Sequence, residues 1–252
     1  MPVSEHNLTL FFSALVGSAI GSFCNVVIYR LPRIMQGECY TLSWPASHCP
    51  HCRKPVKIRH NVPVISWLLL RGRCAACRLP VSLTYPLVEL LTALLYMLVV
   101  WRQGITAQSL FDLFALSLLI PLMFIDLRTM LLPDRLTLPL LVFALLFALS
   151  GVGTLDISGS LIAALLGFAL PCRVSCLFRL LQHQEGLGAG DFKLLAALGA
   201  WLGPQALLEI ISASTLLALL SALLILRVKP GQPFPFGPYP IIAAAVWILL
   251  YH

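Results

Sequence analysis

The stretch "LTLFFSALVGSAIGSFCNVVIY", residues 8–29, decides the fold class because it is 22 residues long and carries no charged side chain. An α-helix of this length spans the ~30 Å hydrocarbon core of a bilayer. No basic region leads into it and no clear cleavage site follows it. We therefore expect a retained first transmembrane helix rather than a signal peptide.

The composition of the whole chain agrees with a membrane protein. Of the 252 residues, 59% are hydrophobic and only 11% are charged, and the mean hydropathy is +0.91. Soluble domains carry about 25% charged residues. The net charge of +7 could suggest a nucleic-acid partner, but basic loops on the cytoplasmic side of a membrane explain it better. We expect an all-α polytopic membrane protein in contact with lipid and no nucleic acid.

Further apolar runs predict about eight transmembrane helices, although several runs are shorter than the ~20 residues that a span usually needs. The sequence Gly203-Pro204 favours a turn that separates the sixth run from the seventh. A count of six or seven remains open. The runs are 8–29, 84–101, 109–125, 137–150, 158–178, 192–203, 206–226 and 237–251.

Basic residues predict the orientation. The segment 30–85 carries nine Lys and Arg residues and one acid, Glu38, so it is expected in the cytoplasm. Alternation of eight spans leaves both termini outside and agrees with fifteen of the seventeen basic residues, Arg102 and Arg173 being the exceptions. We expect three segments without an internal repeat: a first transmembrane helix (1–29), a cytoplasmic insert (30–85) and a helical membrane domain (86–252).

The insert contains two C-x-x-C pairs, "CPHC" at 49–52 and "CAAC" at 74–77. Four thiolates can complete a tetrahedral Zn²⁺ site, and such a site leaves no open position for catalysis. Two disulfides or a redox pair are the alternatives, and a cytoplasmic location disfavours disulfides. We predict a structural zinc site that supplies folding free energy to a small insert. Its ligands are Cys49, Cys52, Cys74 and Cys77.

Three acids in or near the predicted spans have an ordinary explanation. A carboxylate inside a membrane suggests function by default. A paired or capped side chain near a helix end is nevertheless the better interpretation for Glu89, Asp112 and Glu209.

Asp126 and Asp191 differ because the predicted topology brings both to the cytoplasmic edge of the membrane. Two carboxylates that share a site hold one proton between them, so that one can activate water and the other can protonate a leaving amine. This is the chemistry of an aspartic protease. Asp134 is the nearest rival, but it stands beside a proline at a helix start, where capping explains it.

The stretch "EGLGAGDFKLL" (185–195) surrounds Asp191 with glycines and a lysine. Gly186, Gly188 and Gly190 would let the backbone turn tightly and approach a substrate strand. We expect these glycines and Lys193 to form an active-site loop. Taken alone, the motif could equally be a glycine-rich cap with Asp191 as the N-cap of the next helix.

These motifs together resemble the type IV prepilin peptidase family, whose members are membrane aspartic proteases with a G-x-G-D motif. The resemblance covers nearly the whole chain and follows the family's order. The resembling stretches are "GSFCNVVIYRLP" (21–32), "NVPVISWLLLRGRCAAC" (61–77), "YPLVELLTALL" (85–95), "IDLRTMLLPDRLTLP" (125–139), "EGLGAGDFKLLAALGAWLG" (185–203) and "PFGPYP" (235–240).

The resemblance implies an enzyme of the bacterial inner membrane whose active site faces the cytoplasm. Such an enzyme would cleave the basic leader of type IV prepilins or type II secretion pseudopilins after a glycine. It would then methylate the new N-terminus with S-adenosylmethionine. Asp126 and Asp191 match the family's catalytic aspartates. The residues that hold the methyl donor and the oligomeric state stay open, as does the choice between pilin and pseudopilin.

Two other function classes are compatible with parts of the sequence. The chain could be a non-enzymatic membrane assembly factor with a zinc-stabilised docking domain, or a proton-coupled transporter. A transporter is expected to carry its acids near the bilayer midplane at broken helices. A docking protein needs no pair of carboxylates. Proximity of Asp126 and Asp191 would therefore favour the protease.

Overall fold

The computed structural model describes residues 3–49, 51–57, 60–182, 187–225 and 234–251. Within these residues every regular element is a helix, and only two isolated β-bridges occur. The all-α prediction is therefore confirmed. The chain divides after Gly104 into two compact units. The predicted boundaries at residues 29 and 85 stay a prediction.

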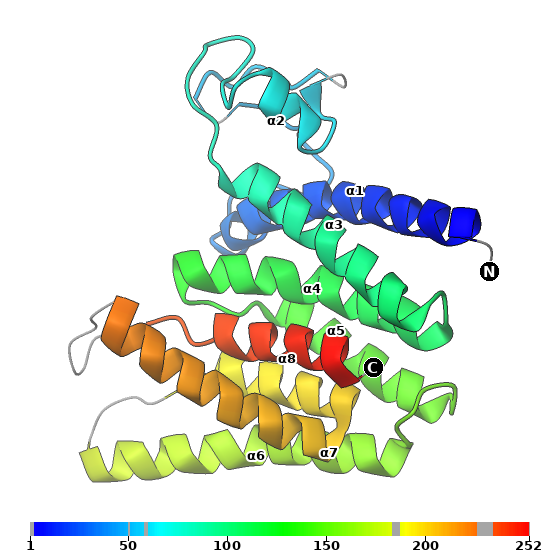
Figure 1. The fold of residues 1–252 in the computed structure, drawn as a ribbon. Coiled ribbons are helices and arrows are strands. Elements are labelled where there is room, and N and C mark those ends of the chain that lie inside the picture. Colours follow the sequence, from blue (N-terminus) through cyan, green and yellow to red (C-terminus); the bar gives the residue numbers. More distant parts are fainter. Residues whose placement is uncertain (1–2, 50, 58–59, 183–186, 226–233, 252) are drawn as a thin grey trace. The chain divides into compact units, whose positions relative to one another are not determined.

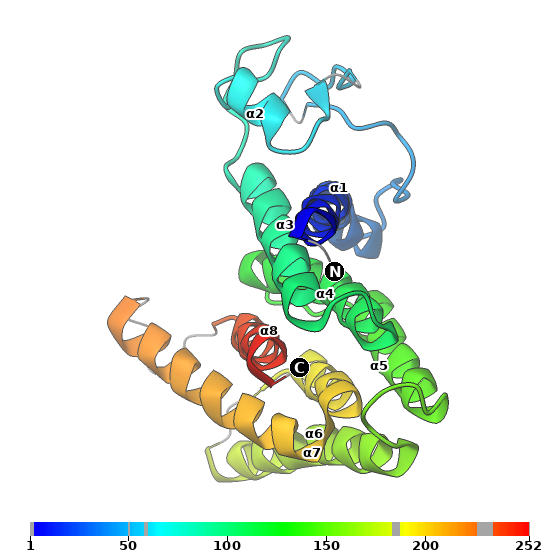
Figure 2. The same cartoon turned by 45° about the vertical axis from the view of Figure 1, so that its right-hand side comes forward.

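The first unit contains two long helices, α1 (Val3–Met35) and α3 (Thr84–Gln103), joined by the insert with its short helix α2 (Ile65–Leu69). Figures 1 and 2 show α1 and α3 crossing each other. Their backbones approach closely at Gly21, where an added Cβ would lie 2.8 Å from Glu89 Cα. Small residues allow such contacts between membrane helices. The Asn25 side chain also donates a hydrogen bond to the Tyr85 carbonyl at 3.0 Å.

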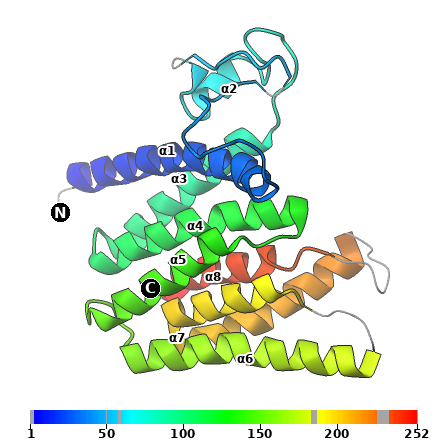
Figure 3. The same ribbon diagram turned by 180° about the vertical axis from the view of Figure 1, so that it is seen from behind.

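The second unit contains the remaining helices, which pack as a bundle (Figure 3). Its principal contacts join α6 to α7, α5 to α7, and α8 to both α7 and α4. The elements are α4 (Ala107–Thr129), α5 (Asp134–Leu149), α6 (Ile157–Gln182), α7 (Ala189–Leu220), the π-helical η2 (Ser221–Ile225) and α8 (Pro238–Tyr251).

The helix α7 is broken at Gly203, whose φ of 88° and ψ of 175° are not helical. Figure 1 shows the yellow and orange halves of α7 running in different directions, so that the chain turns back at this point. Glycine adopts a positive φ without steric cost, and Pro204 fits the first turn of the second half because its missing N–H has no intrahelical partner there. The predicted turn at Gly203-Pro204 is confirmed.

All eight predicted apolar runs fall on helices where the structure describes them. Five helical stretches are long and apolar enough to cross a membrane: α1, α3, α4, α6, and α7 together with most of η2. The helices α5 and α8 are shorter, with 16 and 14 residues. The count of eight membrane crossings therefore stays a prediction.

The three acids expected to be paired are all hydrogen-bonded, as predicted. Asp112 is fully buried, and its Oδ1 accepts two side-chain hydrogen bonds at 2.9 and 3.0 Å. Glu89 accepts one at 2.7 Å, and Glu209 accepts one at 3.0 Å. The donors are the side chains of Gln108 and Trp201 for Asp112, the backbone N–H of Val64 for Glu89, and the side chain of Trp247 for Glu209.

The tight packing of α6 on α7 yields a stability prediction. A Cβ added at Gly199 would lie 2.5 Å from the Ala163 carbonyl oxygen, and backbone cannot move aside easily. We expect Gly199→Val to destabilise the protein by about 1–3 kcal/mol or more, because overpacking forces the helices apart. Thermal unfolding in detergent measures the effect. The matched control is Ala213→Val, at an exposed position of α7; equal melting temperatures for both variants would contradict the prediction.

Candidate active site and metal centre

Asp126 lies in the last turn of α4, where its side chain is buried and the residue is only 4% exposed. The helix ends at Met130, which adopts the left-handed conformation. A carboxylate buried among apolar side chains needs a hydrogen-bond donor. Asp126 Oδ2 accepts one from the backbone N–H of Gly237 at 2.9 Å, immediately before α8 begins.

Asp191 lies in the first turn of α7, because the helix starts at Ala189 rather than after Asp191 as the sequence suggested. Its Oδ2 accepts a hydrogen bond from the backbone N–H of Gly188 at 3.1 Å. Gly188, not Asp191, is the N-cap residue. Asp191 Oδ1 is buried and has no hydrogen-bond partner among the residues that the structure describes. That oxygen can therefore accept a hydrogen bond from water or substrate.

Leu132 lies against both Gly190, next to Asp191, and Gly237, the hydrogen-bond donor of Asp126. A Cβ added at Gly190 would lie 2.9 Å from Leu132 Cβ, and one added at Gly237 would lie 3.1 Å from Leu132 Cδ2. Asp126 and Asp191 are also near enough for their charges to interact. The end of α4, the start of α7 and the start of α8 thus meet at one end of the second unit. The charge interaction and the shared contacts with Leu132 agree with the expected proximity of Asp126 and Asp191, and their catalytic role stays a prediction.

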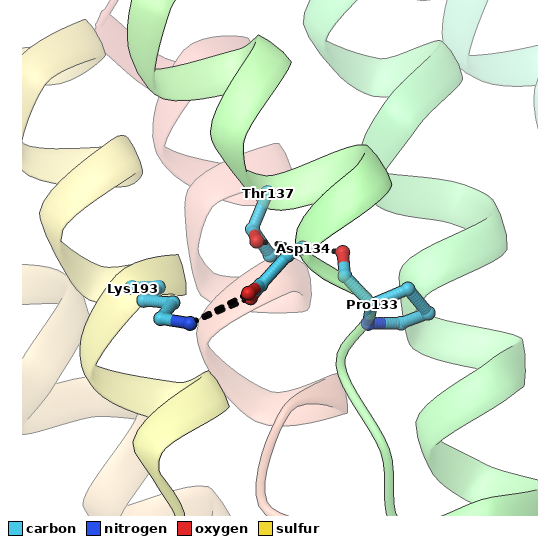
Figure 4. Close-up of polar contacts among 4 residues, drawn as sticks. All are labelled: Pro133, Asp134, Thr137 and Lys193. Carbon is cyan, nitrogen blue, oxygen red and sulfur yellow. Dashed lines mark hydrogen bonds and ion pairs between the residues drawn. The ribbon is translucent and has the colours of Figure 1, made fainter. Parts of the chain in front are cut away.

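Asp134 makes a different contact from the one expected. The N-cap of α5 is Pro133, and no side-chain hydrogen bond caps this helix, so the capping interpretation of Asp134 was wrong. Both carboxylate oxygens of Asp134 instead lie 2.8 Å from Lys193 Nζ (Figure 4). The ion pair joins the first turns of α5 and α7. Thr137, beside it, is buried and donates to the Pro133 carbonyl.

The glycines near Asp191 only partly fulfil their expected role. The backbone does turn here, since the Asp191 N–H donates to the Gly188 carbonyl at 3.1 Å, but neither Gly188 nor Gly190 adopts a positive φ. Gly190 is needed because Leu132 occupies the space of a Cβ, whereas a Cβ at Gly188 would make an ordinary 3.4 Å contact with Asp191 Oδ2. Gly186 lies outside the described residues.

Sequence reasoning missed the role of Gly237. The segment "PFGPYP" (235–240) was noted only as one of the stretches that resemble the family. The structure adds the hydrogen bond to Asp126 and a steric reason for glycine, since an added Cβ would lie 2.9 Å from Asp126 Oδ2. The available signal was Gly237 followed by Pro238, because a glycine before a proline marks a turn.

The four cysteines of the insert form one cluster. Their Sγ atoms all lie within 4.8 Å of one another, and Cys49 Sγ and Cys77 Sγ are 3.8 Å apart. With a Zn–S distance of about 2.3 Å, two sulfurs of a tetrahedral site lie about 3.8 Å apart. All the cysteines of the chain are free thiols, so the alternative of two disulfides is not observed. The cluster has the dimensions of a four-thiolate metal site.

The two C-x-x-C pairs have the same local fold, so the expectation of no internal repeat was wrong. Isolated β-bridges join His48 to Pro55 and Arg73 to Pro80. Corresponding backbone hydrogen bonds, between 2.8 and 3.0 Å, follow in both turns. We call these turns the first knuckle (48–56) and the second knuckle (73–81). In each, an arginine with positive φ follows the second cysteine, Arg53 at 55° and Arg78 at 63°.

Backbone donors favour the thiolate form at one cysteine of the cluster. The N–H groups of Cys77 and Ala76 donate to Cys74 Sγ and lower the pKa of this thiol to about 6. A thiolate, not a thiol, is the form that binds a metal.

Comparison with known proteins decides the family. Residues 113–251 match the type IV leader peptidase family, and residues 15–103 match the bacterial peptidase A24 N-terminal domain. The chain belongs to the type IV leader peptidase family. The boundary between the two matches agrees with the division of the structure after Gly104.

Curated members of the family resemble the chain over most of its length. A prepilin leader peptidase/N-methyltransferase from Aeromonas hydrophila is 43% identical, and the alignment covers 99% of this chain and 91% of the relative. The protein of the same name from Neisseria gonorrhoeae is 40% identical over 94% of this chain and 88% of the relative. One from Klebsiella pneumoniae is 48% identical over 78% and 86%. No solved structure matches the chain.

The contact between Gly237 and Asp126 yields a prediction for this family member. We expect Gly237→Ala to reduce cleavage roughly 10²-fold, because the added methyl group displaces the carboxylate and small displacements of reacting groups are costly. Initial rates of leader cleavage measure the effect. Val246→Ile is the control, since it adds one carbon at an exposed position of α8. A normal rate for a folded Gly237→Ala variant would contradict the role given to Gly237.

Proposed function

We propose that the chain is a membrane aspartyl endopeptidase that removes the basic leader of type IV prepilins or of type II secretion pseudopilins. Membership in the type IV leader peptidase family supports the reaction. The observation that carries the choice of residues is the meeting of Asp126 and Asp191 at one end of the second unit. A non-enzymatic assembly factor would not need this pair, and a transporter would carry its acids near the bilayer midplane at broken helices.

In the proposed reaction the two carboxylates share one proton. The ionised carboxylate takes a proton from water as the water attacks the scissile carbonyl, and the protonated carboxylate donates its proton to the carbonyl oxygen. As the tetrahedral intermediate collapses and the C–N bond breaks, one carboxyl group gives a proton to the leaving amine and the other carboxylate takes a hydroxyl proton back from the intermediate, so that the pair again holds one proton. The backbone N–H groups of Gly188 and Gly237 hold Oδ2 of Asp191 and Oδ2 of Asp126, respectively, in place throughout.

The substrate and the location follow from the family and from the charge pattern. A prepilin has a short basic leader next to an apolar helix, so its cleavage site would lie at the membrane edge, level with Asp126 and Asp191. The basic insert supports a location of this edge on the cytoplasmic side of a bacterial inner membrane. The names of the relatives include N-methyltransferase. Methylation of the new N-terminal amine by S-adenosylmethionine is therefore part of the proposal.

The cysteine cluster is proposed to hold a structural Zn²⁺ ion. Its four ligands would be Cys49, Cys52, Cys74 and Cys77, whose spacing fits a tetrahedral site. Four thiolates leave no position for substrate, so the ion would stabilise the insert rather than take part in hydrolysis.

Replacement of either catalytic aspartate is expected to abolish cleavage. Asp126→Asn or Asp191→Asn removes one member of the acid–base pair, and general acid–base catalysis contributes about 10²–10⁴-fold. We therefore expect cleavage of a co-expressed prepilin to fall at least about a hundredfold, while the protein stays folded in the membrane. Mass measurement of the pilin product reports the result.

Asp134→Asn is the matched control for this experiment. The Asp134–Lys193 ion pair is partly exposed, with side-chain exposures of 51% and 34%. Such pairs contribute about 0–1 kcal/mol, so we expect no more than a roughly fivefold loss of rate. Complete loss with Asp134→Asn, or near-normal processing with Asp126→Asn, would require a different catalytic pair.

Removal of one thiolate is expected to release the metal. Cys49→Ser should lower the zinc content of the purified protein from about one ion per chain to almost none, and should make the insert sensitive to protease, because metal binding and folding are coupled. Cys39→Ser is the matched control, since Cys39 lies in the same insert, is exposed and is outside the cluster. Purified wild-type protein without zinc would disprove the metal site.

A further inference from the structure

The short helix α2 has one packed side and one exposed side. Ser66 is buried and accepts a hydrogen bond from the Val62 N–H at 3.0 Å. Trp67 is half-buried, and its Nε1 donates to the Val81 carbonyl of the second knuckle at 3.2 Å. These contacts fix the orientation of α2 on the insert.

The other side of α2 exposes large apolar side chains. Ile65 is 56% exposed, Leu68 is 61% exposed and Leu69 is 78% exposed. A single exposed leucine needs no explanation, but adjacent ones on the surface of a small domain indicate an interaction site. The first knuckle differs, because Val56, at 38%, is the one exposed large hydrophobic residue among those of its residues that the structure describes.

Basic side chains accompany this exposed side. Arg71 and Arg73 follow α2 directly, and Arg78 belongs to the second knuckle; all three are exposed. No ion pair engages them within the described residues, and residues 39–88 contain no Asp or Glu. An apolar surface with unneutralised arginines is complementary to a partner that has an anionic outer layer and an apolar layer beneath it. A bilayer with anionic headgroups has this layering.

The chain itself keeps the insert near a membrane. The insert is connected at both ends to helices that are long and apolar enough to span a bilayer, α1 and α3. Leu87, Leu90 and Leu94 form an exposed apolar stripe along α3, and Leu83, 67% exposed, extends this stripe beyond the start of the helix toward the second knuckle. The apolar stripe of α3, which would face lipid, is therefore connected through Leu83 to the insert and its exposed apolar residues.

We propose that this surface docks on the anionic lipid headgroups of the membrane that α1 and α3 cross. We call it the α2 patch, consisting of Ile65, Leu68, Leu69, Arg71, Arg73 and Arg78. The three apolar side chains enter the boundary between headgroups and acyl chains, and the arginines bind lipid phosphates. The basic leader of a prepilin is a poor alternative occupant, because like charges repel. The inference rests on the membrane location proposed above but not on the proteolytic mechanism.

Photo-crosslinking of the full chain tests the proposal. The photoreactive residue p-benzoylphenylalanine replaces Leu69 in one variant and Val56 of the first knuckle in a matched control. Both proteins are placed in nanodiscs of phosphatidylcholine alone, or of equal parts phosphatidylcholine and phosphatidylglycerol. Mass spectrometry then identifies what each position has captured.

We expect lipid adducts at position 69 to exceed those at position 56 and to increase with phosphatidylglycerol. Arg71→Gln should lower the yield at position 69 roughly fivefold, the effect of losing one basic residue near an anionic surface. Lys54→Gln in the first knuckle is its control and should leave the yield unchanged. Zinc content and leader cleavage, measured in the same samples, report separately on the folding of the insert and on the proposed enzyme.

Three results would overturn the proposal. These are lipid adducts of equal yield at both positions, no lipid adduct at position 69 in a protein that still binds zinc, and capture of another protein or of a second copy of the chain at position 69. The last result would assign the α2 patch to a protein partner. None of them bears on the roles of Asp126 and Asp191.

Discussion

A carboxylate buried at the end of an apolar helix must be hydrogen-bonded, and the arrangement of the second unit depends on how Asp126 meets this requirement. Its donor is the backbone of Gly237, 111 residues further along the chain. A backbone donor at 2.9 Å leaves no room for a Cβ, since that atom would lie equally close to the carboxylate. The position of α8 against α4 is therefore tied to the position of one carboxylate, and the side chain of Leu132 fills the remaining space toward α7.

Much of the fold could be predicted from the sequence, because a membrane restricts the structures that a chain can adopt. Backbone polar groups inside a bilayer must be satisfied within the chain, so each apolar run is expected to be a helix. The turn at Gly203 was predictable for a different reason, because a glycine followed by a proline is a strong local signal. The proximity of Asp126 and Asp191 followed from charge, since the basic loops assigned both to the same side of the membrane.

Other features could not be predicted, because they depend on contacts between segments distant in sequence. Asp134 beside Pro133 has the local pattern of a helix cap, yet Lys193, 59 residues away, binds its carboxylate. The two knuckles, by contrast, share the pattern C-x-x-C-R-x-P-V, so their similarity is visible in the sequence. The structure adds the matching backbone hydrogen bonds and the positive φ of Arg53 and Arg78.

The two carboxylates are held by the same kind of hydrogen bond, and the donors lie at the starts of two different helices. Each accepts a hydrogen bond from the N–H of a glycine that immediately precedes a helix, Gly188 before α7 and Gly237 before α8. The N-terminus of a helix carries a partial positive charge, so two such ends stabilise a negative charge between them. Among the described residues, the ion pair recorded for Lys193 is with Asp134 and not with either carboxylate. Backbone dipoles thus provide a fixed electrostatic environment for the pair of carboxylates that is proposed to act as acid and base.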